Sequence, residues 1–189
     1  MAKLTFWHKK EDLVNIYKEC CLIHRIPFNP KDFFKYYPIE DEDKIPFSPG
    51  RYTRPEFIKF WLPKQEIVLA EIEKIYRPFP EGDIIIGLFP NTDVLYKIWD
   101  YFKENKSSWE DPCSHTFIDE SKEKVYIILL PLHLDCVTIP RPKALIHELF
   151  HANDMLAFRE RSIGRVSPEK HQYIIDQSGK ITKKYFHPI

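Results

Sequence analysis

The sequence predicts an α+β fold with a small mixed sheet, whose edge strand packs against helices that include one with the pattern HELFH. Short apolar runs at residues 83–89 and 124–132 have the length and composition of buried strands. Apolar residues recur at helical spacing over residues 11–26 and 92–106. The 189 residues fit one domain, residues 1–189, that is long enough to bury a sizeable core.

The first part of the chain, residues 1–80, is expected to be a mainly helical lobe. Residues 11–26 place their apolar side chains on one helical face. Residues 27–50 are rich in proline and aromatic residues, which predicts an irregular connector packed on the core.

A further helix is expected to begin at a capping box. Glu56 follows Thr53 by three residues, so that the two side chains can satisfy N–H groups of the first helical turn. The helix is expected to run toward Tyr76, with a kink or break near Pro63, because proline cannot continue a regular helix.

Residues 81–189 are expected to hold the sheet, the HELFH helix and a C-terminal hairpin. Strands at 116–119 and 124–132 flank a charged turn, which favours an antiparallel pair directly before the HELFH helix. In residues 172–186, apolar and polar residues alternate on both sides of a Ser-Gly step, which predicts the final hairpin.

The composition argues against several classes of function. Lys plus Arg and Asp plus Glu both number 28, and no polybasic tract predicts contact with nucleic acid. No apolar run reaches the roughly 18 residues of a membrane helix, and residues 1–10 lack a signal-peptide core, so a cytoplasmic protein is expected. No CxxC pair occurs, which predicts reduced thiols in an intracellular protein; the cysteines are Cys20, Cys21, Cys113 and Cys136.

The strongest functional signal is the string HELFH, which spans residues 147–151. His147 and His151 lie four residues apart, so on a helix both imidazoles face one side and can bind one metal ion. Glu148 flanks that face, where it can take a proton from a water molecule that zinc has acidified.

The longer string HELFHAND resembles the zincin metallopeptidases. The pattern HExxHAxD is also similar to lethal-factor-like peptidases and to the peptidases that process an ATP synthase subunit. The resemblance covers about eight residues and implies one zinc ion, a peptide or protein substrate, and Glu148 as general base and acid. The predicted order of strand, helix, strands and motif helix resembles the amino-terminal half of zincins, in which the edge strand beside the metal helix binds the substrate backbone.

Asp154 shares the helical face of the two histidines. Its short side chain lies a turn beyond the metal position, so we expect it to orient an imidazole N–H or to contact substrate rather than to bind the metal. The alternative is an exposed aspartate on a solvated helix face.

Catalytic zinc usually has three protein ligands, so a third donor is required. The metzincin motif does not fit, because Asp154 and Ala157 stand where it has Gly and His. His171 follows the motif at about the interval of the third ligand in thermolysin-like enzymes, and Glu169 is the alternative. Upstream donors also remain open; they are Cys113, His115, His133, Asp135 and Cys136.

Two functions follow from these observations. The first is a zinc-dependent metallopeptidase that hydrolyses peptide bonds, with Tyr173 or Tyr185 steadying the oxyanion. The second is a zincin-like binding or regulatory protein without catalysis, whose metal is structural or absent. The lack of an obvious third ligand motivates the second hypothesis.

Overall fold

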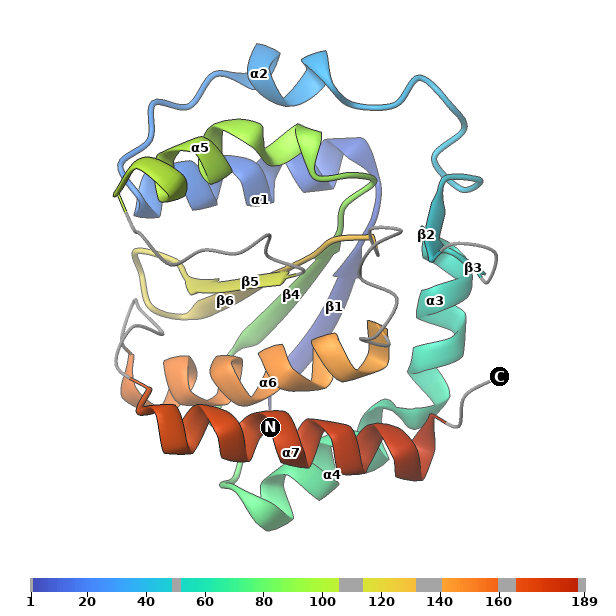
Figure 1. Ribbon diagram of the computed structural model, residues 1–189, viewed down its shortest axis with the longest axis vertical. Coiled ribbons are helices and arrows are strands. Elements are labelled where there is room, and N and C mark those ends of the chain that lie inside the picture. Colours follow the sequence, from blue (N-terminus) through green and yellow to red (C-terminus); the bar gives the residue numbers. More distant parts are fainter. Residues whose placement is uncertain (1, 49–51, 106–113, 132–140, 160–165, 187–189) are drawn as a thin grey trace.

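The chain folds around a four-stranded sheet that is covered by helices on both faces (Figure 1). This computed structural model describes residues 2–48, 52–105, 114–131, 141–159 and 166–186. The mixed α+β class predicted from the sequence is confirmed.

The sheet combines parallel and antiparallel pairing, in the order β1-β4-β6-β5. β1 (Lys3–Trp7), β4 (Asp83–Leu88) and β6 (Lys124–Leu129) are parallel, and β5 (Ser114–Ile118) runs antiparallel to β6 at the edge. The predicted hairpin is therefore confirmed. β1 was not predicted, and the first part of the chain is not only helical, because this strand contributes to the main sheet.

One face of the sheet is covered by helices from two separate parts of the chain. They are α1 (Lys10–Ile23), α2 (Pro30–Lys35), η2 (Asp93–Leu95) and α5 (Tyr96–Asn105). Gly87 of β4 allows α1 to pack closely, since a Cβ there would lie 2.5 Å from Cδ1 of Ile16. Asn91 caps the later helical segment by accepting a hydrogen bond from the Val94 N–H at 3.1 Å.

The other face is covered by the remaining helices, which share a second hydrophobic cluster with the sheet. They are α3 (Arg54–Trp61), η1 (Leu62–Lys64), α4 (Gln65–Ile75), α6 (Arg141–Phe158) and α7 (Pro168–Tyr185). The expected start of α3 is confirmed, because the Glu56 carboxylate accepts a hydrogen bond from the Thr53 N–H at 2.6 Å. The expected break near Pro63 is the single 3₁₀ turn between α3 and α4.

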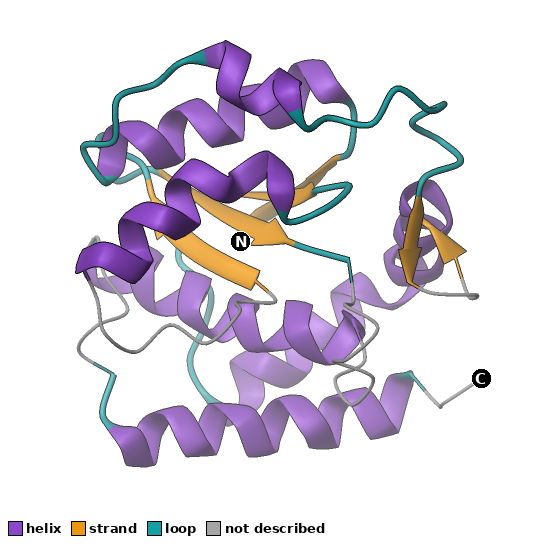
Figure 2. Cartoon of the chain, turned by 45° about the horizontal axis from the view of Figure 1, so that its top comes forward, coloured by secondary structure: helices purple, strands orange, loops and turns teal. Residues whose placement is uncertain are grey.

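Residues 27–50 are less irregular than expected. Besides α2, they contain β2 (Pro46–Ser48), which pairs with β3 (Tyr52–Thr53) in a small sheet apart from the main one (Figure 2).

The predicted C-terminal hairpin is wrong, because the tail forms the long helix α7. Ser167 caps its first turn and Pro168 begins it, as is typical of helix starts. Ile174, Ser178 and Ile181 form its buried stripe, and the Ser178 hydroxyl donates within the helix to the Ile174 carbonyl at 2.7 Å. Helical spacing therefore outweighs the apparent alternation around the Ser-Gly step.

Within the described residues, no helix is both long enough and apolar enough to span a membrane.

Candidate metal centre

Three histidine side chains from two helices meet on the α6 and α7 side of the sheet. Nε2 of His147 lies 3.0 Å from Nε2 of His151 and 3.2 Å from Nε2 of His171. One ring nitrogen from each of the three lies within 4.8 Å of the other two, which is close enough to hold one metal ion. We call this group the histidine triad.

The triad is assembled by one local and one tertiary contact. His147 and His151 lie one turn apart on α6, so their rings share a face. His171 comes from the first part of α7, which turns back and runs beside α6 (Figure 1). The cap at Ser167, whose hydroxyl accepts from the Lys170 N–H at 3.2 Å, determines where α7 begins and hence where His171 stands.

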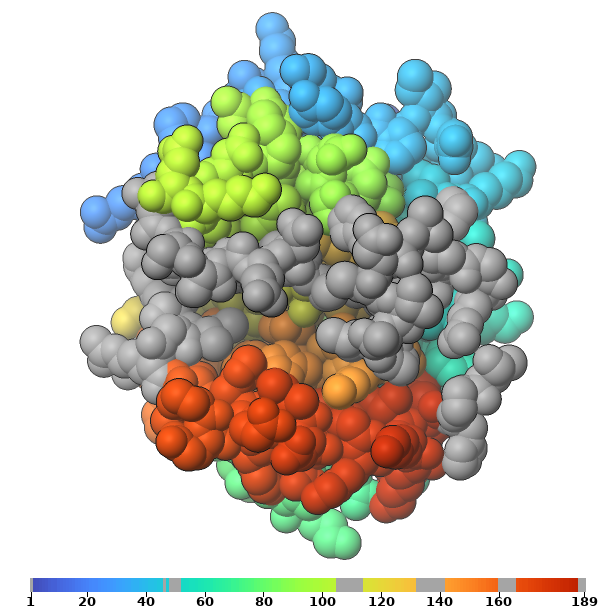
Figure 3. Space-filling view, viewed as in Figure 1, coloured from blue at the N-terminus to red at the C-terminus, as the bar shows by residue number. Residues whose placement is uncertain are grey.

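The triad joins buried and solvent-facing donors. His151 is buried, His147 is half-buried and His171 is exposed. In the space-filling view, atoms of α6 reach the molecular surface next to α7 (Figure 3). Solvent can therefore reach the side of the triad that His171 forms.

The histidines of α6 have pKa values that suit metal binding. Burial is the main cause that lowers the pKa of His147 to about 4. Burial likewise lowers the pKa of His151. Both imidazoles are therefore neutral near pH 7, which is the form that binds metal ions.

Glu148 lies under the edge strand of the sheet. The Ser114 hydroxyl donates to its Oε1 at 2.7 Å, and the Thr116 hydroxyl donates to its Oε2. Burial alone would raise the pKa of Glu148, but the nearby imidazoles of α6 and these hydroxyl donors outweigh it and keep the pKa below its usual range. Glu148 is thus a buried carboxylate, held in place on both oxygens.

The hydrogen bond and ion pairs of the Asp154 carboxylate are with other side chains than the imidazoles, so it does not orient an imidazole N–H; the alternative expectation, contact with substrate, stays a prediction. Its Oδ2 accepts a hydrogen bond from Tyr76 at 2.7 Å and lies 2.8 Å from Nζ of Lys170, while its Oδ1 lies 3.0 Å from Arg77. Because Lys170 precedes His171, the carboxylate ties the first turn of α7 to α6. Asp154 therefore supports the triad indirectly, and its side chain is only 12% exposed.

The other predicted donors are not in the triad. Glu169 is exposed and outside the group of three nitrogens. His115 lies on β5 but joins a separate group with Cys20 and His24 on the other face of the sheet. The remaining upstream candidates, Cys113, His133, Asp135 and Cys136, lie outside the described residues.

Neither tyrosine suggested for the oxyanion has its hydroxyl at the triad. The Tyr173 hydroxyl donates to the Ile75 carbonyl at 2.9 Å, and that of Tyr185 donates to Glu71 at 2.7 Å. Both tyrosines tie α7 to α4, which is a structural role.

Ser114, Thr116 and Lys170 were not identified from the sequence. Ser114 and Thr116 do carry a weak signal, because hydroxyl residues two apart on a strand point to the same side. Nothing in the sequence shows that Glu148 lies on that side, since the contact joins residues 32 and 34 positions apart.

No protein-family model, curated protein or solved structure matches this chain.

Proposed function

We propose that the protein is a zinc-dependent metallopeptidase with a zincin-like fold. The observation that carries the proposal is the convergence of three imidazoles beside a buried carboxylate, at the edge strand of the sheet. His147, His151 and His171 would hold the zinc ion.

The donor set fits a catalytic zinc ion. Three imidazoles are a ligand set that zinc uses in catalytic sites, where a fourth position remains for water. The exposure of His171 leaves the triad open to solvent, as a catalytic site requires. When bound, zinc would acidify a water molecule and polarise the scissile carbonyl.

Glu148 is the general base and acid in this proposal. It is ionised near neutral pH and interacts electrostatically with the imidazoles of His147 and His151, so its carboxylate would accept a proton beside the triad. The hydroxyls of Ser114 and Thr116 limit its rotation while leaving further lone pairs on both carboxylate oxygens. The same carboxyl group would return the proton to the leaving amine.

The edge strand suggests how a peptide or protein substrate binds. Among the described strands, β5 pairs with β6 only, so the backbone groups of its other edge can pair with an extended peptide. Ser114 and Thr116 place this strand next to Glu148. A peptide added along β5 would therefore pass close to the triad.

The test is Glu148→Gln in zinc-loaded protein, assayed on denatured casein and on a pool of quenched fluorescent peptides. We expect hydrolysis to fall about 10²- to 10⁴-fold, the range of general acid–base catalysis. Zinc content should stay unchanged, because Glu148 is not a ligand. A Glu148→Gln protein that cleaves as fast as wild type contradicts the mechanism.

A non-catalytic binding or regulatory role is the second candidate, and one observation favours it. Glu148 is only 6% exposed and already accepts a hydrogen bond on each oxygen, an arrangement that also suits a purely structural carboxylate. Stoichiometric zinc in a protein that hydrolyses none of these substrates would support this role instead of catalysis.

A further inference from the structure

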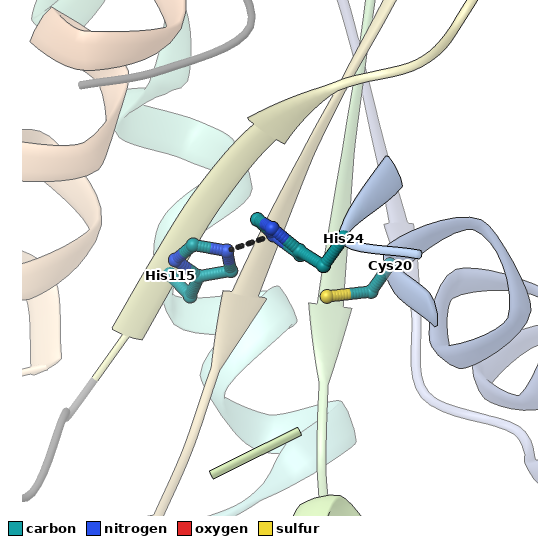
Figure 4. A group of neighbouring side chains, drawn as sticks. All are labelled: Cys20, His24 and His115. Carbon is teal, nitrogen blue, oxygen red and sulfur yellow. Dashed lines mark hydrogen bonds between the residues drawn. The ribbon is translucent and has the colours of Figure 1, made fainter. Parts of the chain in front are cut away.

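A second group of metal-binding side chains lies on the opposite face of the sheet from the triad. Figure 4 shows His24 and His115 pointing toward each other, with Cys20 of α1 beside them; His24 is the C-cap residue of the same helix. Nε2 of His24 is 3.2 Å from Nε2 of His115, and one donor atom from each of the three lies within 4.8 Å of the other two. We call this group the Cys-His cluster.

The sequence brings these residues together through two simple periodicities. Cys20 lies in the last turn of α1 and His24 is its C-cap residue, four positions later, so their side chains lie on the same side of the helix end. His115 lies on β5 between Ser114 and Thr116, so its side chain points to the opposite side of the sheet from theirs. One strand therefore faces the triad with two residues and the Cys-His cluster with the residue between them.

The geometry suits a metal ion. Two zinc–nitrogen bonds of about 2.0–2.1 Å at a tetrahedral angle place the nitrogens about 3.4 Å apart, close to the 3.2 Å seen here. A hydrogen bond between two neutral imidazoles has a similar length, so this distance alone does not distinguish a metal site from a hydrogen bond. The third donor does favour a metal, because a cysteine sulfur one helical turn from His24 also lies within reach of both rings.

Aromatic rings surround the Cys-His cluster. The His24 ring meets Phe102 edge-on at a centroid distance of 4.7 Å, and the His115 ring stacks on Phe117 at 5.9 Å. Cys20 is fully buried and His115 is 7% exposed. The rings and the burial of two of the three donors leave little room for a substrate, which suits a structural role rather than a catalytic one.

We propose that Cys20, His24 and His115 form a second metal site, which takes a thiophilic d¹⁰ ion, Zn²⁺ or Cu⁺, and ties α1 to the edge strand β5. The thiol of Cys20 loses its proton to solvent as the sulfur–metal bond forms, and no oxidation takes place. The inference does not depend on peptidase activity, because the Cys-His cluster shares no residue with the triad.

Cobalt(II) is the probe that separates the two sites, because only a thiolate ligand produces an intense near-ultraviolet charge-transfer band. The histidine triad has no sulfur and cannot produce it. In a His147→Ala/His151→Ala protein, which lacks the triad, we expect one equivalent of cobalt with this band. Displacement by Zn²⁺ or by Cu⁺ under anaerobic conditions then shows which ion binds more tightly.

Two further variants in that background assign the band. Cys20→Ser should abolish it, whereas Cys21→Ser should retain it, because Cys21 is an equally buried free cysteine on the same helix outside the Cys-His cluster. His24→Gln, at a half-buried position, should weaken cobalt binding at least tenfold. It also serves as a second ligand variant if Cys20→Ser does not fold.

Absence of the band in the triad-free protein, or its persistence after Cys20→Ser, overturns the proposal. If the triad-free protein does not fold, the band is measured in the wild-type chain and in its Cys20→Ser and His24→Gln forms, with the same criteria. Failure of the peptidase proposal would appear separately: the wild-type protein would hydrolyse none of the substrates, or its histidine triad would bind no metal ion.

Discussion

Each face of the sheet carries a group of side chains that could hold a metal ion, and the two groups are built alike but surrounded differently. In each group two donors lie four residues apart along one helix or at its C-cap, and the third donor comes from another element. The triad uses imidazoles only and includes the exposed His171, with ionic side chains around Asp154 nearby. The Cys-His cluster includes a thiol and lies among aromatic rings.

The spacing of the donors alone therefore does not determine the function of a site. A position open to solvent allows water and substrate to reach a metal, whereas packing among aromatic rings restricts the access of both. The strand β5 takes part on both sides, through Ser114 and Thr116 toward Glu148 and through His115 toward Cys20. Changes on each face should therefore produce different kinds of effect.

The largest effect should come from His171→Ala, which would leave the triad with only two ligands. We expect hydrolysis to fall more than about 100-fold, since even the hydrogen-bond partners of metal ligands change affinity or activity by 10- to 100-fold. Metal content by elemental analysis should fall by one ion per chain. His8→Ala, which lies outside both metal-binding groups, is the control and should keep its zinc and activity.

Acid should destabilise the metal-free protein by protonating the buried groups at and beside the histidine triad. The pKa of His147 falls from 6.5 in the unfolded chain to about 4 in the fold, so between these pH values the unfolded chain binds more protons. Its contribution to the free energy of unfolding is therefore full above pH 6.5 and declines as the pH falls to about 4. The lowered pKa values of His151 and Glu148 act in the same direction.

The expected loss attributable to His147 is on the order of 3–4 kcal/mol, from a shift of about 2.5 pKa units at about 1.4 kcal/mol per unit. Urea unfolding of metal-free protein at a series of pH values measures it. In a His147→Gln protein the slope between pH 6.5 and 4 should be shallower; an unchanged slope would contradict the assignment.

Thr116→Val tests whether the edge strand positions Glu148. The substitution keeps the side-chain shape and removes a hydroxyl that donates to a buried carboxylate. Hydrogen bonds to charged groups contribute about 1.5–3 kcal/mol, so hydrolysis should fall about 10- to 100-fold at full zinc occupancy. Thr5→Val, on the opposite edge strand β1, is the matched control and should leave the rate unchanged.

A positioning role for Thr116 should also alter the pH–rate profile. Loss of a donor to the ionised form of Glu148 raises its pKa, so the acidic limb of the profile should move to higher pH. A lower rate with an unmoved profile would indicate a general loss of structure instead.

The smallest effect should come from Asp154→Asn, which weakens the link between α6 and the first turn of α7. We expect a loss of about 1–2 kcal/mol in the free energy of unfolding, because Arg77 and Lys170 are partly solvated and can find water. Asp43→Asn is the control, since its pair with Lys9 is exposed to solvent and should contribute little to stability. Equal effects of the two substitutions in urea unfolding would contradict a supporting role for Asp154.

Metal affinity should also distinguish the two faces of the sheet. Asp154→Asn should also weaken metal binding at the triad, because Lys170 and His171 are neighbours on α7. The cobalt–thiolate band of the Cys-His cluster should not change, since that group lies across the sheet.

Much of the fold could be predicted from the sequence because its signals are local. The capping box at Thr53, the break near Pro63 and the β5–β6 hairpin depend on neighbouring residues, and all three are confirmed. The long tail helix was mistaken for a hairpin, because a Ser-Gly step resembles a turn when the packing of α7 against α6 is unknown. β1 was missed because a five-residue strand is stable only once it pairs with β4.

Local sequence spacing alone places two donors of each group one helical turn apart: His147 with His151 on α6, and Cys20 of α1 with its C-cap residue His24. The geometry of a helical turn places such pairs on one face whatever the rest of the chain does. Only the tertiary structure decided the third donor of each group and the partners of Glu148. These contacts join residues that are distant in sequence, and packing of the helices on the two faces of the sheet brings them together.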